Sequence, residues 1–354
     1  MDHRPLGRTG VSVSKLCLGA MMFGTWGEPD HDESIRIIHA ALDAGINFID
    51  TADVYSAGES EEIVGKALKG RRDDVVLATK LFMPIGDDSD PNRRGTSRRW
   101  IIEEVENSLR LLGTDYIDLY QVHRPSPETD LEETLGALDD LVHQGKVRYI
   151  GHSTYPASLI VEAQWVARDR RLQRFVTEQP PYSILTRGIE NEVLPTCQKY
   201  GMGVIPWSPL QGGWLSGRYR KDTDITGPVS TARQRLADRY DLSLPENQRK
   251  LDAAEQLAQL AEETGLTLIQ LAIAFVLNHP AATAPIIGPR TMEHLESQLA
   301  AADVVLDDAV LDRIDEIAPP GTNLNAADAG WQSPALQPTA RRRKRNPRNC
   351  VMAT

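Results

Sequence analysis

Short apolar runs alternate with amphipathic segments along most of the 354-residue chain. Most runs are four to seven residues long and rich in valine, isoleucine, leucine or aromatic residues, which is typical of strands that are buried on both faces. The pattern predicts eight strands, at residues 15–20, 47–52, 75–80, 117–123, 147–153, 175–179, 203–207 and 283–288.

The segments between these runs carry apolar residues at helical spacing. In one of them, apolar residues recur at steps of four, four and three. This spacing puts four side chains on one face of a helix: Ile101, Val105, Leu109 and Leu112. The segment 131–141 has a similar spacing, with Asp130 before it as an N-cap signal and Gly145 after it as a C-cap signal. Helices are therefore expected between the strands.

Eight strands that are each followed by a helix predict a parallel sheet, because parallel neighbours need a crossover helix. Eight such units over roughly 250 to 300 residues favour a closed (β/α)8 TIM barrel over an open doubly wound sheet. The sequence also lacks the GxGxxG turn that a doubly wound dinucleotide domain shows. We expect residues 1–318 to form one α/β barrel domain.

Three pieces lie outside the eightfold pattern. Residues 4–14 predict a short N-terminal β-hairpin with Thr9-Gly10 as its turn. Residues 212–246 form a long polar loop that is a candidate lid. Residues 319–354 are rich in proline, alanine and arginine without periodicity, which predicts an extended or disordered tail.

The net charge of −11 is uneven, because residues 341–348 (RRRKRNPR) hold six positive charges and leave −11 − 6 = −17 for the remainder. An acidic body argues against nucleic-acid binding as the main role. The basic cluster could contact an acidic partner or an anionic membrane, and a solvated disordered terminus is the interpretation we prefer.

The cysteines and the apolar content predict a cytoplasmic protein. Only three cysteines occur, without a CxxC spacing, which argues against a disulfide scaffold or a zinc ribbon and fits a reducing compartment. The first ten residues lack the apolar region of a secretory signal, and no apolar run approaches the roughly 18 to 20 residues that span a bilayer.

Polar side chains gather where the expected strands end, which is the face at which (β/α)8 barrels carry their chemistry. The second strand ends near Asp50 with Tyr55 just beyond, the third ends in Lys80, and the fourth ends in His123. Taken alone, each has an ordinary alternative: a helix-capping or ion-paired carboxylate, a surface aromatic, a solvated lysine, a core histidine. Their coincidence on three successive strands favours an active site.

These four residue types suit proton donation to an oxygen whose carbon receives a hydride. A tyrosine hydroxyl has a pKa of about 10, and a nearby lysine lowers that pKa and stabilises the phenolate. A carboxylate keeps the lysine charged, and an imidazole can orient a carbonyl oxygen. The set contains no nucleophile, and the sequence shows no HExxH, GxSxG or GxxxxGK[ST] motif and no histidine spacing that indicates a metal site.

Several segments together resemble the aldo-keto reductase superfamily, over about residues 4–317: GINFIDTADVYSAGESEEIVGKAL, VVLATK, LGTDYIDLYQVHRP, PWSPLQGGWLSGRY and PIIGPRTMEHLESQL. The resemblance implies a (β/α)8 barrel that binds NADPH in extended form and transfers a hydride to an aldehyde or ketone, or back from an alcohol. It makes Tyr55 the general acid, with Lys80 and Asp50 tuning it and His123 positioning the carbonyl.

The resemblance also implies a set of cofactor-binding residues. Ser153 and Gln179 match positions that hold the nicotinamide carboxamide, and Thr154 stands where the family often has asparagine. Trp207 matches the aromatic residue that stacks on the nicotinamide ring. The loop against the pyrophosphate is matched by Ser208, Leu210 and Gly212.

At the adenosine end, Gly288 begins the segment that leads into the last barrel helix. Arg290 there is placed for the adenosine 2′-phosphate, because a helix start favours anions and arginine binds phosphate well, which favours NADPH over NADH. His294 and Gln298 stand where the family frequently has glutamine and asparagine.

We therefore expect an NADPH-dependent carbonyl reductase with a small-molecule substrate, no metal, no nucleic-acid or membrane partner, and a homo-oligomer as a possibility. One alternative is a cofactor-sensing partner protein like the potassium-channel β-subunits that share this barrel. Another is a lyase or aldolase with Lys80 as a Schiff base, which the aromatic-plus-serine pattern after residue 206 argues against. An apolar pocket for hydrophobic or aromatic carbonyls is expected from Trp26, Phe82, Trp100 and Trp214.

Overall fold

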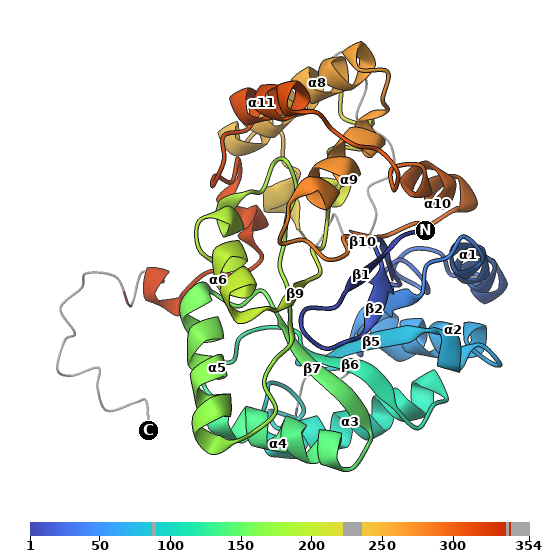
Figure 1. The fold of residues 1–354 in the computed structure, drawn as a ribbon, viewed down its shortest axis with the longest axis vertical. Coiled ribbons are helices and arrows are strands. Elements are labelled where there is room, and N and C mark those ends of the chain that lie inside the picture. Colours follow the sequence, from blue (N-terminus) through green and yellow to red (C-terminus); the bar gives the residue numbers. More distant parts are fainter. Residues whose placement is uncertain (87–89, 222–235, 338–339, 341–354) are drawn as a thin grey trace.

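The computed structural model describes residues 1–86, 90–221, 236–337 and 340. Eight parallel strands form its centre (Figure 1), which confirms the predicted (β/α)8 barrel. They are β3 (Cys17–Gly19), β4 (Phe48–Asp50), β5 (Val76–Leu81), β6 (Ile117–Val122), β7 (Val147–Ser153), β8 (Thr177–Gln179), β9 (Gly203–Val204) and β10 (Ile286–Ile287).

The sheet runs in the order β10-β3-β4-β5-β6-β7-β8-β9, and the chain closes it between its two outer strands. The amide of Thr283 donates to the carbonyl of Val204 at 2.8 Å, and that of Ile286 donates to the carbonyl of Pro206 at 2.8 Å. β9 and β10 are shorter than the expected strands 203–207 and 283–288. Pairing with the β8 side nevertheless continues past the end of β9, because the amides of Ile205 and Trp207 donate to the carbonyls of Glu178 and Pro180, both at 2.9 Å.

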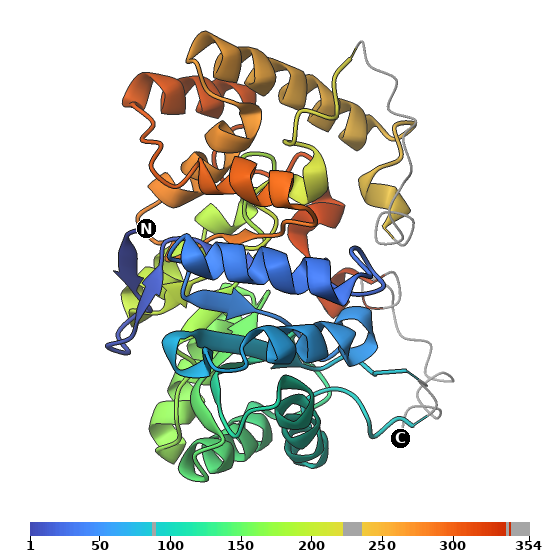
Figure 2. The same cartoon turned by 90° about the vertical axis from the view of Figure 1, so that its right-hand side faces the viewer.

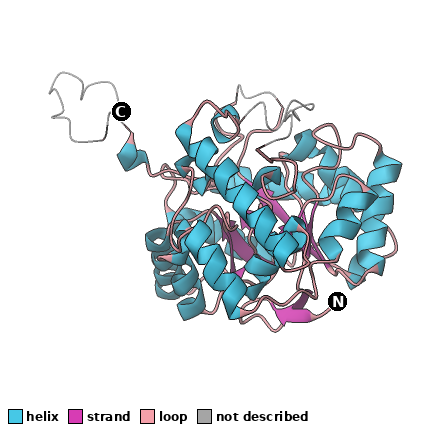
Figure 3. Cartoon of the chain, turned by 90° about the horizontal axis from the view of Figure 1, so that it is seen from above, coloured by secondary structure: helices cyan, strands magenta, loops and turns pink. Residues whose placement is uncertain are grey.

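Helices surround the barrel (Figure 3) and cover the outer faces of the strands. They are α1 (His31–Asp43), α2 (Glu59–Ala67), α3 (Arg98–Leu112), α4 (Leu131–His143), α5 (Ala157–Arg170), α6 (Val193–Tyr200), α8 (Pro245–Glu263), α9 (Leu268–Asn278), α10 (Met292–Leu299) and α11 (Asp308–Ile317). α3 and α4 are the two helices that the apolar spacing predicts. Asp130 is the N-cap residue of α4 but its side chain makes no capping hydrogen bond, and Gly145 follows the C-cap residue with φ 76°.

The N-terminal hairpin closes the end of the barrel where the strands begin (Figure 2). It pairs β1 (His3–Pro5) with β2 (Ser12–Ser14), and Thr9-Gly10 lies in its turn as predicted. Leu6 and Val13 of the hairpin are fully buried against the side chains that fill the barrel interior. Burying each such side chain contributes roughly 1.5 to 3 kcal/mol, so apolar packing fills this end and polar groups are left for the other.

The C-terminal segment was expected to be extended or disordered from residue 319, and residues 321–328 of it are bonded to the barrel. The amide of Arg187 donates to the carbonyl of Thr322 at 2.8 Å, and that of Leu324 donates to Leu185 at 3.1 Å. Two short 3-10 helices follow, η6 (Ala326–Ala329) and η7 (Pro334–Leu336). The domain boundary at 318 stays a prediction, and the basic cluster 341–348 lies outside the described residues.

The expected lid is described only at its two ends, which hold the 3-10 helices η4 (Gln211–Gly213) and η5 (Ala237–Arg239), and residues 222–235 lie outside the described part of the chain. Further 3-10 helices occur at η1 (Tyr55–Gly58), η2 (Arg72–Asp74) and η3 (Gly188–Glu190). Within the described ranges, no single helix combines the length and apolar composition of a membrane span. The pair α8 and α9 does so only jointly and bends by 94° between its halves.

Candidate active site

A buried ion pair lies at the centre of the barrel rim where the strands end. Lys80 of β5 is 0% exposed, Asp50 at the end of β4 is 2% exposed, and the Lys80 Nζ lies 2.6 Å from the Asp50 Oδ2. The same Nζ donates to the carbonyl of Thr51 at 2.8 Å and to the hydroxyl oxygen of Tyr55 at 3.2 Å. Tyr55 is placed by η1, which begins directly after the loop that follows β4.

The other carboxylate oxygen of Asp50 is held by two amide side chains. Gln121 of β6 donates its Nε2 to the Asp50 Oδ1 at 3.0 Å, and Gln179 of β8 donates its Nε2 to the same atom at 2.7 Å. Gln121 was missed by the sequence analysis, although a polar residue inside an apolar run, two positions before His123, was a signal that both face the same side. Asp50 is therefore fixed from three strands.

Electrostatics at this centre keeps the tyrosine protonated. Burial raises the pKa of Tyr55 above its usual 10 and outweighs Lys80, which lowers it. Lys80 thus lowers the pKa of Tyr55 in the expected direction, but desolvation of the phenolate is larger and gives a net increase. Burial lowers the pKa of Lys80, but Asp50 and Tyr55 raise it to a net increase, so the ammonium stays charged.

His123 lies beside the tyrosine, just past the end of β6. The two rings meet edge to face, with centroids 5.8 Å apart. Burial, and then the charges of Lys80 and Arg124, lower the pKa of His123 well below 6.5, so the imidazole is neutral. Its Nδ1 is buried and has no hydrogen-bond partner among the described residues. The structure brings the four predicted residues together, and their catalytic roles stay predictions.

The residues expected at the nicotinamide end lie on the adjacent strands β7 and β8. The hydroxyl of Ser153 donates to the carbonyl of Gln179 at 2.8 Å, and Thr154 follows it in the left-handed region with φ 61°. Arg124 was not singled out from the sequence. Its guanidinium donates to the Thr154 Oγ1 at 3.1 Å and lies 5.9 Å from the centroid of the Trp207 ring. The Trp207 Nε1 is buried without a partner in the described chain.

The residues expected along the pyrophosphate and adenosine are less connected. Ser208 and Gly212 adopt left-handed conformations, with φ 59° and 61°, and the carbonyl of Gly212 accepts from Tyr240 at 3.1 Å. Leu210 is half-buried and packs against the outer core. At β10 and α10 the structure exposes Gly288, Arg290 and His294. The Oε1 of Gln298 is buried and accepts no hydrogen bond within the described ranges.

Two of the four aromatic residues expected in a substrate pocket are core residues instead. Trp100 on α3 is 2% exposed and Trp214 is 1% exposed, and both belong to the hydrophobic core. Trp26 is half-buried, with its ring 6.0 Å from that of Tyr55, and Phe82 is half-buried after β5. Only these two remain candidates for contact with a substrate.

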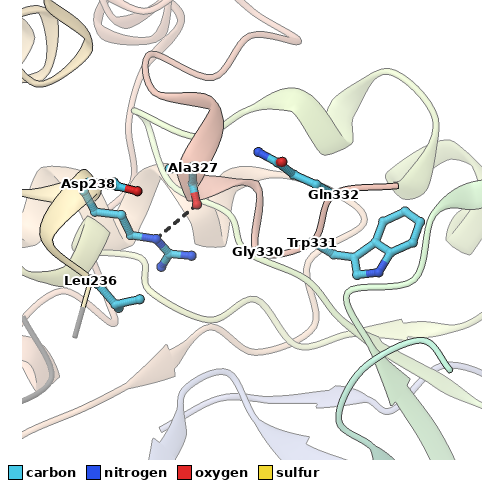
Figure 4. Close-up of a pocket in the computed structure, with 7 residues that line it drawn as sticks. Leu236, Asp238, Ala327, Gly330, Trp331 and Gln332 are labelled. Carbon is cyan, nitrogen blue, oxygen red and sulfur yellow. Dashed lines mark hydrogen bonds between the residues drawn. The ribbon is translucent and has the colours of Figure 1, made fainter. Parts of the chain in front are cut away.

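The C-terminal segment forms a cavity of about 380 Å³ beside the rim (Figure 4). Its lining includes Arg239, whose Nε donates to the carbonyl of Ala327 at 3.0 Å, and Trp331. Gly330, also in the lining, packs so closely that a Cβ there would lie 2.8 Å from the Trp207 ring. The segment thus reaches the residues expected at the nicotinamide end, which the sequence did not indicate.

Comparisons with known proteins agree with this geometry. The model of the Aldo/keto reductase family matches residues 15–319. The chain is 43% identical to the uncharacterized oxidoreductase YrpG of Bacillus subtilis, over 90% of this chain and 96% of that protein. It is 37% identical to a putative voltage-gated potassium channel subunit beta of Schizosaccharomyces pombe, over 90% and 93%. It is 34% identical to versiconal hemiacetal acetate reductase of Aspergillus parasiticus, over 89% and 96%.

Proposed function

The chain belongs to the aldo/keto reductase family, and from that premise we propose that it reduces aldehydes or ketones with NADPH, with Tyr55 as the general acid. The observation that carries the proposal is the contact of one buried ammonium, that of Lys80, with both the Asp50 carboxylate at 2.6 Å and the Tyr55 hydroxyl at 3.2 Å. The reverse reaction, oxidation of an alcohol, uses the same groups.

The residues around the rim fit a nicotinamide dinucleotide. Buried polar atoms of Trp207 and Gln298, at the two ends of the expected cofactor path, have no partner in the described structure. Ser153 and Gln179 supply a hydroxyl and an amide for the carboxamide, and no described residue donates to the Oε1 of Gln179. Arg290 is exposed beside the start of α10 and forms no ion pair with a described residue, which suits it to a phosphate. When bound, NADPH supplies the hydride.

The mechanism then follows from the charges of this chain. Tyr55 is protonated at neutral pH and can donate its proton to the carbonyl oxygen as the carbonyl carbon gains the hydride. The Lys80 ammonium stabilises the phenolate that this leaves, and Asp50 keeps Lys80 aimed at it. Neutral His123 donates a hydrogen bond that orients the carbonyl oxygen. Solvent reprotonates Tyr55 after the alcohol leaves.

The second candidate is a cofactor-sensing partner protein with slow turnover. It is favoured by the 37% identity with a protein named as a potassium channel subunit beta. The same four residues and the same cofactor would serve both functions, so the rim does not separate them. The rate of turnover does, because a sensor binds NADPH without needing rapid hydride transfer.

The test is NADPH oxidation across aldehydes, ketones, quinones and sugars, with NADH measured in parallel and NADPH binding measured by fluorescence titration. Turnover of at least one carbonyl class, at about 1 s⁻¹ or faster as enzymes commonly show, supports the reductase. Tight NADPH binding with turnover below that range for every compound would favour the sensor. A chain that binds no NADPH would contradict both.

We further propose a cytoplasmic location, on the ground that Cys17 and Cys197 are buried free thiols, as a reducing compartment allows. Fractionation of cells that express the tagged chain tests it. Recovery mainly in a secreted or membrane fraction would contradict this location.

A further inference from the structure

A buried contact between a histidine and a glutamate lies directly behind the strand ends where the nicotinamide is expected. His152 on β7 and Glu178 on β8 are both fully buried, and the His152 Nδ1 meets the Glu178 Oε2. In the strand register His152 lies opposite Glu178, and the next residue on each strand follows the same pairing, so that Ser153 lies opposite Gln179. Side chains alternate along a strand, so the His152–Glu178 pair faces away from the barrel interior while the following pair faces it.

The carboxylate of Glu178 also holds the turn that follows β7. Its Oε1 accepts the backbone N–H of Tyr155 at 3.2 Å, and the backbone N–H of Thr154 donates to the same carboxylate. Thr154 has φ 61°, a conformation that β-branched residues rarely adopt. A buried carboxylate is costly unless its oxygens accept hydrogen bonds, and here the bonds it accepts come from this turn and from His152.

Two aromatic rings enclose the imidazole of His152. Its ring stacks on Tyr155 with centroids 4.3 Å apart and meets Phe175 edge to face at 4.8 Å. Its Nε2 is buried and has no partner in the described chain. The ring is thus held by its Nδ1 contact with Glu178 and by the two aromatic rings.

The opposite side of the turn is held by Arg124. Its Nη1 donates to the Thr154 Oγ1 at 3.1 Å and to the carbonyl of His123 at 2.7 Å. Thr154 is thus fixed through its backbone by Glu178 and through its side chain by Arg124. The turn therefore connects the predicted catalytic histidine with Ser153.

We propose that Glu178 and His152 are positioning residues that fix Ser153, Thr154 and Gln179 for the nicotinamide carboxamide, an inference that rests on the proposed function. Neither residue touches the cofactor; both act through the turn and the strand ends. Their loss frees the turn to leave its left-handed conformation, which weakens the hold on the nicotinamide end and leaves the adenosine end, carried by α10, as it was.

The first test measures binding at the two ends separately. NADPH and adenosine 2′,5′-bisphosphate, which lacks the nicotinamide, are titrated against wild type, Glu178→Gln and Glu104→Gln. Glu104 is an equally buried carboxylate on α3, outside the site, and serves as the matched control. We expect Glu178→Gln to weaken NADPH binding about tenfold, the effect of losing charged hydrogen bonds, with bisphosphate binding unchanged and with Glu104→Gln unchanged for both.

His152 provides the rescue pair. His152→Phe keeps the ring contacts with Tyr155 and Phe175 but removes the Nδ1–H donor, and we expect it to behave like Glu178→Gln. His152→Asn places an amide N–H near the position of Nδ1, and we expect it to restore most of the NADPH affinity. These two variants also keep the proposal testable if Glu178→Gln does not fold.

The second test uses the stereochemistry of hydride transfer, which a general loss of stability would not change. With NADPH deuterated on one or the other face of C4, we expect wild type to transfer a single label and Glu178→Gln to transfer a mixture. Unchanged NADPH affinity with unchanged stereospecificity would overturn this inference alone, as would equal losses for NADPH and the bisphosphate. A wild-type chain that binds no NADPH would overturn the proposed function and this inference with it.

Discussion

The two halves of the rim are built in different ways. The catalytic half, on β4, β5 and β6, is buried, and Asp50 in it accepts hydrogen bonds from both Lys80 and Gln121. The adenosine half, at β10 and the start of α10, presents an exposed Gly288 and an exposed Arg290. The charged groups of the first half are paired within the protein, whereas Arg290 in the second half is exposed, and we infer that its partner is a phosphate.

The difference follows from the cost of burying charge. A buried ammonium or carboxylate destabilises the fold by several kcal/mol unless it is paired and hydrogen-bonded, so the catalytic half must assemble during folding. An exposed arginine costs little and needs no partner. Substitutions should therefore affect both stability and turnover in the first half, and only ligand binding in the second.

The largest effect is expected from Lys80→Met. It leaves the Asp50 carboxylate buried with amide donors only, so we expect the free energy of unfolding to fall by about 3 to 5 kcal/mol and turnover to fall at least about 1,000-fold. Asp50→Asn combined with Lys80→Met should recover much of the stability and none of the turnover. Denaturant unfolding measures the stability, and steady-state rates measure the turnover. If the stability losses of the two substitutions simply add in the double variant, the two halves do not differ in this way.

A smaller effect is expected from a carboxylate behind the catalytic strands. Glu61 on α2 accepts from the Thr79 hydroxyl at 2.6 Å, and burial raises its pKa from 4.5 to about 7. A raised carboxyl pKa gives stability that is complete below pH 4.5 and is lost as pH rises through about 7. Glu61→Gln should therefore match wild type near pH 4 and exceed it by up to about 3 kcal/mol at pH 8.

Unfolding free energies across this pH range measure that gain. Glu293→Gln on the exposed start of α10 is the matched control and should show no such gain. A constant difference between Glu61→Gln and wild type at every pH would mean that the Glu61 carboxyl does not titrate in this range.

The smallest effect on the protein itself is expected from Arg290→Ala. Because Arg290 is exposed and forms no ion pair with the described residues, stability should stay within about 0.5 kcal/mol of wild type. NADPH affinity should fall about 10-fold or more, the contribution of a charged contact with phosphate, while NADH affinity changes less than about twofold. Equal losses of affinity for NADPH and NADH in fluorescence titration would contradict the proposed contact between Arg290 and the 2′-phosphate.

The same contrast explains what the sequence could predict. The positions of Asp50 and Lys80 followed from strand ends, because parallel strands bring their carboxyl ends to one rim. Gln121 was missed because one amide inside an apolar run does not break the strand pattern. The His152–Glu178 pair was missed because it exists only through strand register. The observed β9 and β10 are shorter than the apolar runs from which they were predicted.

Other features depend on long-range contacts that no local pattern reveals. The docking of residues 321–330 beside the rim rests on hydrogen bonds such as Leu324 to Leu185 and on the fit of Gly330 against Trp207. The net direction of the Tyr55 pKa depended on how deeply the fold buries the hydroxyl, which spacing alone does not give. The sequence thus predicted which residues form the site better than it predicted the long-range contacts and the burial around them.

The most direct test of the central claim is Tyr55→Phe, measured by single-turnover NADPH oxidation together with NADPH titration. The substitution removes one oxygen atom from the contact with Lys80 and leaves the ion pair with Asp50 in place. We predict a rate of hydride transfer lower by about 100- to 10,000-fold, the usual contribution of a general acid, with NADPH affinity within about twofold of wild type. A variant that keeps the wild-type rate would contradict Tyr55 as the proton donor.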